Sequence, residues 1–279
     1  MKDRNTSDVR ALLQRQEGRL PSSEDGGNSS CAQGDLMIAV VILAKNEENT
    51  IREVVESVQP FADEIVVMDG GSVDRTSIRA REAGAAVHTD PGLGKGSAIR
   101  ASLEIARGDI VVFMDADGSH AASDISRLVA PIIAGEADLV VGSRFTGGSE
   151  ELSVNVPQLV RTIGNISMNI AINTRFGVEL TDTLNGFRAI RASAARALLL
   201  KEDRHTIEQE MVIQALRRGF RVINRPAHEY AREFGESTIS VWREWPRFVW
   251  CVVRNLLQRP IAAPGGSDYR RDHPPGAGS

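Results

Sequence analysis

The chain has 279 residues, of which 42% are hydrophobic, so it is long and apolar enough to bury a sizeable core. Its formal net charge of -4 argues against a nucleic-acid-binding protein, because tracking of phosphates needs a concentrated basic face. The two cysteines, Cys31 and Cys251, exclude a disulfide framework and a cysteine-rich zinc site. We therefore expect a folded protein of a reducing compartment that binds no nucleic acid.

Both ends of the chain are polar and contain few large apolar residues. Residues 1–36 include the run PSSEDGGNSS, and residues 260–279 are rich in Pro and Gly. Such segments cannot offset the entropy of ordering by burial, which predicts a flexible N-terminal arm and a disordered tail. The folded region is then a domain over residues 37–240, followed by a helix over residues 241–259.

Two further patterns bear on location. No basic head followed by an apolar stretch begins the chain, so a secretory signal is not expected. No apolar run reaches the length that a membrane-spanning helix needs. We expect a cytoplasmic protein whose contact with a membrane is at most peripheral, on the cytoplasmic face.

Short runs rich in Val and Ile alternate with helix-like segments along the folded region. The runs are continuous rather than alternating, which is typical of parallel strands covered on both faces. The predicted strands lie at residues 38–43, 64–68, 85–88, 109–114 and 138–142. The predicted helices lie at residues 47–58, 73–83, 95–107 and 123–134, with Ser72 and Ser123 as N-caps and Pro131 bending or shortening the last helix. This order predicts an α/β fold with a doubly wound, mostly parallel sheet and helices on both faces.

An acidic pair follows the fourth of these strands, in the stretch FMDADGSH (residues 113–120). Residues i and i+2 of extended chain project to the same face, so Asp115 and Asp117 should point the same way. Two carboxylates about 4 Å apart repel by roughly 1 kcal/mol in water and by several times more in a half-buried cleft. A Mg2+ or Mn2+ ion would neutralise them, with Ser119 adding an oxygen ligand. The alternative is an acidic turn without metal, with His120 making local hydrogen bonds.

The stretch DPGLGKGSAIRAS (residues 90–102) lacks the spacing of a nucleotide-binding P-loop. Its glycines still permit close backbone approach, and Lys95 lies where a helix is predicted to begin. Glycines, a helix start and a lysine together suit an anion. A glycine-rich turn with a solvated lysine fits the pattern equally well.

Two other strand ends carry polar side chains with two possible roles. Asp69 can accept hydrogen bonds from a base or ribose, or can simply favour the turn that it begins. Glu47, in AKNEE (residues 44–48), can bind a ligand or favour the first turn of the next helix. In open α/β sheets ligands bind beyond the carboxyl ends of the strands, where these residues are predicted to lie.

An ordered set of segments resembles family-2 glycosyltransferases of the dolichol-phosphate mannosyltransferase-like group. The segments are VILAKNEE, VVMDGGSVDRT, GLGKGSAIRAS, VVFMDADGSH, VVGSRF, TDTLNGFRAIR and AREFGES, which together cover about residues 38–240. The resemblance implies a GT-A fold, a GDP- or UDP-linked hexose as donor, and Mg2+ or Mn2+ as cofactor. Three departures bear on the donor base and sugar: Gly70 replaces a second aspartate, Asn185 replaces a Ser or Thr, and no proline follows the acidic motif.

The same resemblance assigns roles residue by residue. Glu47 and Asp69 would meet the nucleoside, and Lys95 would lie near the base or the phosphates. The metal would be held by Asp115, Asp117 and Ser119. The whole donor-binding set is Ala44, Asn46, Glu47, Asp69, Ser72, Lys95, Asp115, Ala116 and Asp117. The residues given catalytic roles are Asp117, Asp182, Arg144, Arg161 and Arg232, where the arginines would surround the diphosphate or an anionic acceptor.

The nature of the acceptor decides whether a base is needed. The resemblance implies inversion by direct displacement, and a polyprenyl phosphate acceptor is already an anionic nucleophile. A hydroxyl of a soluble small molecule would need a base, for which Asp182 is the candidate. The alternative role of Asp182 is to brace its loop. A protein that binds a nucleotide sugar without catalysis is a further alternative.

The segment SVWREWPRFVWCVVRNLLQR (residues 240–259) bears on this choice. It contains Trp242, Trp245 and Trp250, its apolar residues recur at helical spacing, and it has four arginines against one glutamate. Tryptophan-rich, basic, amphipathic segments can lie in a membrane interface. A helix that packs on the domain, or that pairs two copies in a homodimer, would show the same pattern.

Overall fold

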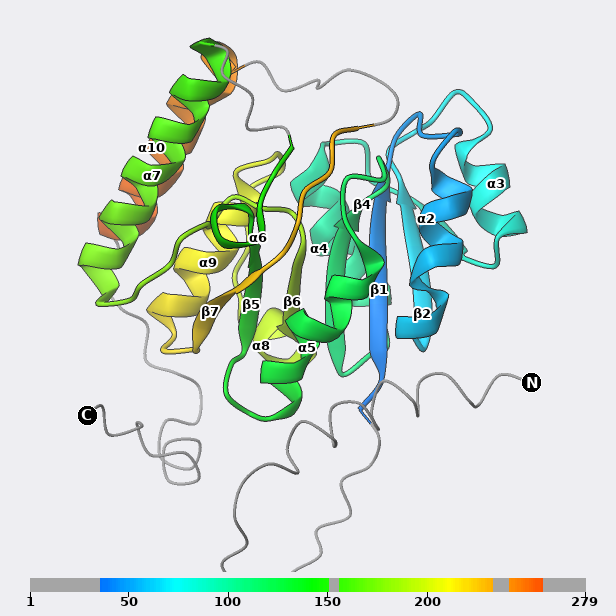
Figure 1. Ribbon diagram of the computed structural model, residues 1–279, viewed down its shortest axis with the longest axis horizontal. Helices are drawn as coiled ribbons and strands as arrows, with labels where there is room; N and C mark the ends of the chain where they lie inside the picture. The colour runs from blue at the N-terminus through cyan, green and yellow to red at the C-terminus, as the bar shows by residue number, and fades with distance from the viewer. Residues whose placement is uncertain (1–35, 151–155, 233–240, 258–279) are drawn as a thin grey trace, which may run out of the picture.

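A computed structural model describes residues 36–150, 156–232 and 241–257, with the side chains of residues 156–161 and 241–246 outside the description. The flexible arm predicted for residues 1–36 and the tail predicted for residues 260–279 fall almost wholly on residues outside these ranges. The described residues form one α/β unit in which a central sheet is flanked by helices (Figure 1).

The sheet has seven strands in the order β3-β2-β1-β4-β6-β5-β7. The pairs β1·β2, β1·β4, β2·β3 and β5·β7 are parallel, whereas β6 runs antiparallel to both of its neighbours. The strands are β1 (Ile38–Ala44), β2 (Glu64–Asp69), β3 (Ala86–Thr89), β4 (Ile110–Asp115), β5 (Leu139–Ser143), β6 (Arg188–Arg191) and β7 (Val222–Pro226). The doubly wound, mostly parallel sheet predicted from the sequence is therefore confirmed.

The sequence pattern predicted β1 to β5 to within one or two residues but missed the last two strands. β6 begins and ends with arginines, and Arg188 is fully buried, so the strand does not read as an apolar run. β7 lies at the sheet edge and is mostly half-buried, with Asn224, Arg225 and Pro226 at its end. Both strands depend on tertiary partners rather than on their own composition.

Eleven helical segments connect the strands within the described residues. They are α2 (Ile51–Val58), η1 (Gln59–Phe61), α3 (Thr76–Glu82), α4 (Lys95–Ile105), η2 (Ala122–Asp124), α5 (Ile125–Ile133), α6 (Arg144–Gly147), α7 (Val156–Phe176), α8 (Ala192–Ala197), α9 (Ile207–Arg217) and α10 (Val241–Leu257).

The predicted N-caps were wrong. α3 begins after Arg75 and α5 after Asp124, in neither case with a side-chain cap. Ser72 instead donates its hydroxyl to Asp69, and Ser123 lies inside η2. Pro131 lies inside α5, which ends two residues later.

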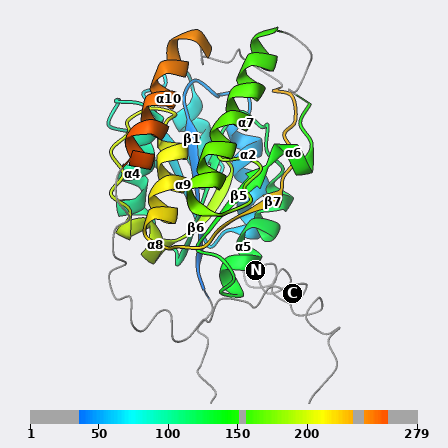
Figure 2. The same cartoon turned by 90° about the vertical axis from the view of Figure 1, so that its left-hand side faces the viewer.

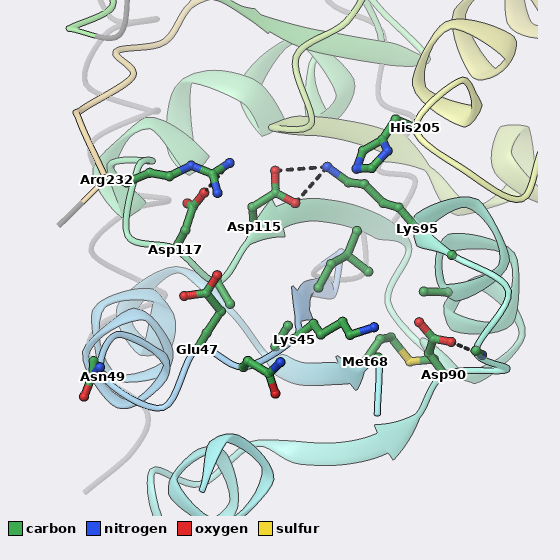
Figure 3. Close-up of a pocket in the computed structure, with 18 residues that line it drawn as sticks. Lys45, Glu47, Asn49, Met68, Asp90, Lys95, Asp115, Asp117, His205 and Arg232 are labelled. Atoms are coloured by element: carbon green, nitrogen blue, oxygen red, sulfur yellow. Dashed lines mark hydrogen bonds and ion pairs between the residues drawn. The ribbon is translucent and has the colours of Figure 1, made fainter. Parts of the chain in front are cut away.

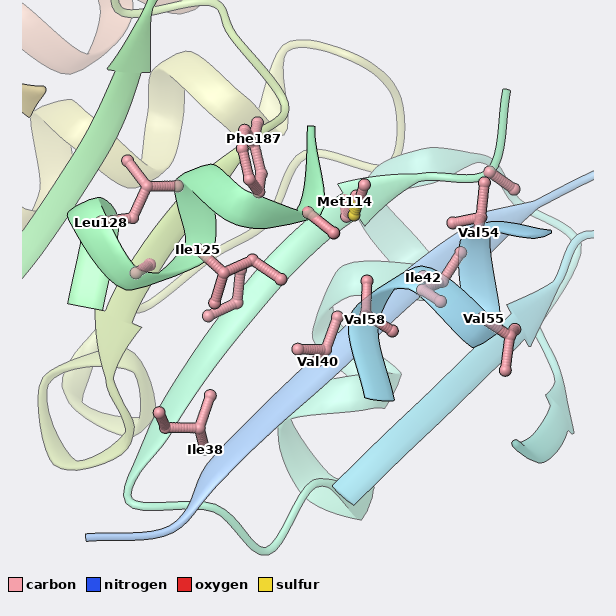
Figure 4. Close-up of a cluster of buried hydrophobic side chains, with 14 of the residues drawn as sticks. Ile38, Val40, Ile42, Val54, Val55, Val58, Met114, Ile125, Leu128 and Phe187 are labelled. Carbon is pink, nitrogen blue, oxygen red and sulfur yellow. The ribbon is translucent and has the colours of Figure 1, made fainter. Parts of the chain in front are cut away.

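The two faces of the sheet are buried by different helices because successive residues of a strand point to opposite sides. Val40 and Ile42 of β1 belong to the cluster that contains α2, α3 and α5 (Figure 4). Ala39 and Val41 belong to the cluster that contains α4, α7, α9 and α10. All four of these β1 side chains are fully buried, so β1 forms the centre of both cores.

The long helices α7 and α10 lie side by side along one side of the molecule (Figures 1 and 2). α10 packs on α9: Cys251, Val252 and Asn255 are buried, and the Gln214 amide donates to Asn255 Oδ1 over 3.1 Å. An ion pair of 2.7 Å joins Arg254 to Glu202. The predicted helix at 241–259 thus packs on the domain. Over the described ranges no helix is both long and apolar enough to cross a membrane.

Strand register brings the sequence motifs to one edge of the sheet. Ala44 at the end of β1 pairs with Asp69 of β2, and Leu43 pairs with Asp115 of β4. The loop after β4 is fixed from the other side by the buried Thr50, whose hydroxyl donates to the Ala116 carbonyl over 2.7 Å. The acidic motif is therefore held at both its strand and its loop.

We predict that Thr50→Val lowers the free energy of unfolding by about 1–3 kcal/mol, because the near-isosteric change leaves the Ala116 carbonyl without this donor in a buried place. Denaturant unfolding at pH 7 measures the loss. Ser57→Ala on the same helix removes a less buried hydroxyl bond to Val54 and is the matched control, with a smaller effect. Equal stability of Thr50→Val and the wild type would contradict this role of Thr50.

Candidate functional site

A cleft of about 630 Å3 lies beyond the carboxyl ends of β1, β2 and β4 (Figure 3). Its walls come from six stretches of the chain that are separated in sequence. The lining residues are Leu43, Ala44, Lys45, Asn46, Glu47, Asn49, Met68, Gly70, Asp90, Gly92, Gly94, Lys95, Ala98, Asp115, Ala116, Asp117, His205 and Arg232. The residues predicted to bind the donor all line this cleft except Asp69 and Ser72.

Lys95 and Asp115 form an ion pair at the centre of the cleft (Figure 3). Lys95 Nζ lies 2.8 Å from Asp115 Oδ1, 3.0 Å from Asp115 Oδ2 and 2.7 Å from Glu208 Oε1. The side chain of Lys95 is only 14% exposed. One ammonium group is therefore shared by two carboxylates in a place where water screens little.

The electrostatics follow from this sharing. Burial by itself would lower the pKa of Lys95, but the charges of Asp115 and Glu208 outweigh it and raise that pKa. Burial would raise the pKa of Asp115, but Lys95 and then His120 hold it well below its usual range. Lys95 and Asp115 are consequently both charged at neutral pH, and Glu208 completes the cluster of three groups around this ion pair.

Asp117 lies on the side of the cleft toward Glu47 and Arg232 (Figure 3). Its Oδ1 accepts from the Ser119 hydroxyl over 2.6 Å and from the Ser119 amide over 3.0 Å, and its Oδ2 lies 3.0 Å from Arg232 Nη2. Burial raises the pKa of Glu47, and the neighbouring charge of Asp117 raises it further. This corner of the cleft therefore carries more negative charge than its cations balance.

A divalent ion fits this donor set. Across the described part of the chain, no group of three or more His, Cys, Asp and Glu side chains is placed to hold a metal. Mg2+ and Mn2+ bound with nucleotides commonly use one or two protein carboxylates and complete their shell with phosphates and water. Asp115 and Asp117 provide such a pair of hard oxygen ligands, and both line the cleft beside the carboxylate of Glu47. The Ser119 hydroxyl donates to Asp117, and the Ser119 carbonyl accepts from the Tyr230 amide. In this arrangement Ser119 orients Asp117.

Asp69 and Ser72 are engaged inside their own loop. Asp69 is buried; one of its oxygens accepts from the Ser72 amide and hydroxyl, over 2.9 and 2.6 Å, and the other accepts from the Ser77 hydroxyl. Ser72 in turn accepts from the Asn46 amide over 2.8 Å, at a residue whose φ is positive. These contacts agree with the turn-forming alternative for Asp69. The pair shapes the loop that carries Asn46 to the cleft.

The sequence left open whether the glycine-rich stretch forms an anion site or a turn with a solvated lysine. In the structure the amides at the start of α4 are engaged within the chain, and Lys95 is largely buried. The amides of Gly96 and Ser97 donate to the Asp203 carbonyl over 2.8 and 3.3 Å. A Cβ on Gly94 would lie 2.7 Å from the same oxygen, and one on Gly96 would collide with the Glu202 carbonyl. The close approach that these glycines permit is thus to the loop before α9, and it places Lys95 against Glu208.

Asp182 is fully buried and forms a two-point ion pair with Arg144. Arg144 Nε lies 2.7 Å from Asp182 Oδ2, and Nη2 lies 3.2 Å from Oδ1. Asn165 and the Leu184 amide add hydrogen bonds of 3.2 and 3.1 Å to Oδ1. Burial would raise the pKa of Asp182, but the Arg144 guanidinium outweighs it and lowers that pKa. These contacts agree with the bracing role rather than with a base.

The predicted arginines therefore divide into separate places. Arg232 lines the cleft and contacts Asp117, whereas Arg144 lies with Asp182 and is 3.5 Å from Glu229. The structure does not describe the side chain of Arg161.

Three residues near the cleft were missed by the sequence reasoning. Glu208 and His205 belong to the segment HTIEQE, where two glutamates flank Gln209 at the start of α9. Arg188 lies fully buried beneath the cluster and donates to the carbonyls of Asn185, Glu208 and Thr183. The acidic helix start was a visible signal for Glu208, but its pairing with Lys95 joins residues more than a hundred positions apart.

The family model of "Glycosyl transferase family 2" matches residues 39–199, which is more than half of the chain. The chain belongs to this family. The family-2 glycosyltransferase is an enzyme with a GT-A type fold, as the ordered motifs predicted. The non-catalytic alternative is therefore set aside.

Two curated relatives of this glycosyltransferase come from archaea. Glycosyltransferase AglJ of Haloferax volcanii is 32% identical over 205 residues, which are 72% of this chain and 66% of that protein. The UDP-N-acetylglucosamine–dolichyl-phosphate N-acetylglucosaminyltransferase of Methanococcus voltae is 30% identical over 251 residues, which are 80% of this chain and 99% of that protein.

Solved structures of a bacterial enzyme share the fold. Glucosyl-3-phosphoglycerate synthase of Mycobacterium tuberculosis in complex with Mn2+, UDP and phosphoglyceric acid has a TM-score of 0.62 and 26% identity, covering 83% of this chain and 81% of that one. The same enzyme in complex with Mg2+ and UDP has a TM-score of 0.60 and 25% identity, covering 83% and 82%.

We predict that Asp182→Asn lowers the free energy of unfolding at pH 7 by about 3 kcal/mol, because it removes the nearest counter-charge of the buried Arg144 and leaves only the more distant Glu229. A carboxyl group with a lowered folded-state pKa stabilises the fold above its unfolded pKa and loses that contribution as the pH falls through the folded value. The difference between wild type and variant should therefore narrow below the ordinary value of 3.8.

Urea unfolding between pH 7 and pH 3 measures this difference. Asp63→Asn, which removes the charge from the acceptor of the Ile38 amide, is the control. A variant as stable as the wild type at pH 7 but without turnover would restore Asp182 as the candidate base.

Proposed function

We propose that this enzyme is a metal-dependent, inverting hexosyltransferase that moves a sugar from a GDP- or UDP-linked donor to a polyprenyl phosphate. The observation that carries the donor half is the acidic pair, Asp115 and Asp117, at the floor of a cleft of about 630 Å3 beyond the strand ends. The complexes of the similar structures with Mn2+ or Mg2+ and UDP support the same assignment.

The cleft residues can divide the work of donor binding. Asn46 and Glu47 at the end of β1 would meet the nucleoside, while Asp115 and Asp117 would hold a divalent ion. That ion, when bound, would neutralise the charge that develops on the leaving diphosphate. Arg232 and Lys95 line the same cleft and would add fixed positive charge toward the diphosphate oxygens. The side chain of Arg232 is 30% exposed, and contact with a ligand would require its guanidinium to turn from Asp117.

The proposal of a phosphate acceptor rests on the ion pair that Asp182 forms with Arg144. Because both of its oxygens are held by Arg144 and neighbouring donors, it is poorly placed to take a proton from a hydroxyl. A phosphate nucleophile needs no such base. The archaeal relative that acts on dolichyl phosphate supports a lipid acceptor. The second candidate is a soluble phosphorylated small molecule, which the phosphoglyceric acid complexes of the similar structures favour.

An apolar surface supports the lipid over the soluble acceptor. The described outward positions of α7 and α10 carry exposed aliphatic and aromatic side chains, namely Ile163, Ile166, Ile170, Val249, Trp250, Val253 and Leu257. The inward side of α7 carries the buried Asn165 and Asn169 beside Met168 and Ile172, so this helix exposes isoleucines while it buries two asparagines. We propose that this surface rests on the cytoplasmic face of a membrane, with Arg247 and Arg175 toward anionic lipid headgroups.

We predict that Mn2+ and UDP together stabilise the wild type and that Asp117→Asn removes this effect. At 100 times its Kd a ligand stabilises the folded state by about 2.7 kcal/mol, which raises Tm by roughly 5–10 °C for a domain of this size. Thermal unfolding with UDP, with and without Mn2+ and EDTA, measures it. Glu53→Gln, an exposed carboxylate on α2 outside the cleft, should respond like the wild type. An unchanged shift for Asp117→Asn would remove the metal from the proposal.

We predict that the full chain floats with vesicles containing phosphatidylglycerol and that Trp250→Ser with Val253→Ser reduces this binding at least roughly tenfold. Full burial of a large apolar side chain contributes about 1.5–3 kcal/mol, and each substitution removes part of that contribution to membrane binding. A loss of about 1.4 kcal/mol weakens binding tenfold. Flotation at equal lipid measures the change. Removing residues 241–279 is not a clean test, because Cys251, Val252 and Asn255 are buried against the domain.

The matched control is Ile78→Ser, which removes a 49%-exposed side chain from α3 on the opposite side of the molecule (Figure 1). Binding equal in all proteins would contradict the membrane surface. A dimer in light scattering that the double variant converts to a monomer would assign the surface to a second copy instead. Transfer of label to phosphoglyceric acid but not to polyprenyl phosphate would select the soluble acceptor.

A further inference from the structure

Glu208 lies behind the cleft, where it contacts a residue that lines the cleft. Its Oε1 lies 2.7 Å from Lys95 Nζ, yet Glu208 is not among the residues that line the cleft. Its side chain is 8% exposed, and its carbonyl accepts from Arg188 Nη1 over 2.6 Å. Glu208 is therefore a fixed anchor behind Lys95 at the beginning of α9.

The three charged groups converge on Gly186. A Cβ there would lie 2.7 Å from Lys95 Nζ, 2.9 Å from Asp115 Oδ2 and 3.0 Å from Glu208 Oε1. The absence of a side chain at Gly186 leaves these atoms in contact with one another. It also keeps Lys95 within reach of both carboxylates without a movement of the backbone.

Lys95 thus competes with a metal ion for Asp115. Both oxygens of Asp115 lie within 3.0 Å of the ammonium group, and a carboxylate engaged in this way is a poorer ligand for a second cation. An ion that binds at Asp115 therefore has to weaken this pair. The cost of doing so is smaller if Lys95 keeps another carboxylate beside it.

We propose that Glu208 is a positioning residue that holds Lys95 when Asp115 turns to the metal and the donor diphosphate. This inference rests on the proposed metal-dependent donor binding and adds a residue to it. Glu208 keeps the ammonium group charged and in the cleft, so that Lys95 exchanges Asp115 for the anionic donor. Glu208 acts through Lys95 and needs no contact with the substrate.

Manganese binding without donor tests this role independently of turnover. Free Mn2+, measured by electron paramagnetic resonance, gives the Kd of the wild type and of Glu208→Gln. Loss of the charge leaves Lys95 entirely on Asp115, so the Kd should rise roughly tenfold, within the usual range of coupling between sites. Glu208→Asp, which keeps the charge, should restore part of the affinity.

Glu210→Gln is the matched control. It removes a buried carboxylate from the same turn of α9, but its contacts are the amides of Lys201 and Glu202 and the side chain of Arg254. Its Kd for Mn2+ should equal that of the wild type. Thermal unfolding of each variant shows that the comparison is made between folded proteins.

A double-mutant cycle separates the proposed role from the simple loss of a nearby negative charge. In a Lys95→Gln background the proposal predicts that Glu208→Gln changes the Kd for Mn2+ much less than it does in the wild type. An equal effect in both backgrounds, or no effect in either, would overturn the role of Glu208 while leaving metal binding intact. Absence of Mn2+ binding by the wild type, with and without UDP, would overturn the proposed function as well.

Discussion

The repulsion among carboxylates at the ends of β1 and β4 is the constraint on which the rest of the site depends. Asp115 ends the buried strand β4, and Asp117 lies in the loop whose Ala116 carbonyl is held by Thr50, so the backbone at both residues is fixed. Lys95 and Arg232 relieve the repulsion in the structure as described, one at each aspartate. Burial raises the pKa of Glu47 at the edge of the cleft, and the charge of Asp117 raises it further.

Much of the surrounding structure serves to keep these charges in place. Gly186 leaves room for the cluster of Lys95, Asp115 and Glu208, and the loop before α9 closes over the start of α4 through the Asp203 carbonyl. Arg188 is fully buried without a carboxylate in hydrogen-bonding contact; burial lowers its pKa, and the field of Glu208, followed by that of Asp182 and Asp115, opposes this. A buried guanidinium with carbonyl partners therefore adds positive potential beneath the cleft without occupying it. Charged side chains therefore extend from Arg188 in the buried strand β6 to Lys95 and Asp115 in the cleft.

The sequence was sufficient for the parts of the fold that follow local rules. Apolar runs of Val and Ile predicted β1 to β5, and the rule that ligands bind beyond strand ends predicted the acidic motif and Glu47 in one cleft. β6 could not be predicted in this way, because Arg188 contradicts the pattern of a buried strand. Its hydrogen-bond partners are carbonyls of the preceding loop and of Glu208 on α9.

The partners of the predicted residues were also beyond the reach of pattern reasoning. The spacing of TDTLNGF suggests a loop but not that Arg144 closes on Asp182 from another element. Likewise the glycines around Lys95 indicated close approach, whereas their partner proved to be the backbone of Glu202 and Asp203 rather than a ligand. Pairings between distant segments are set by the topology of the sheet, so they become visible only once the strands are ordered.

The most direct test of the central claim is manganese anomalous scattering from crystals grown with UDP and Mn2+. The account predicts an anomalous peak in contact with the carboxylates of Asp115 or Asp117 and with the diphosphate, and a Lys95 ammonium that has moved away from Asp115. A nucleotide bound elsewhere, or a diphosphate in the cleft with no metal beside the acidic pair, would contradict it.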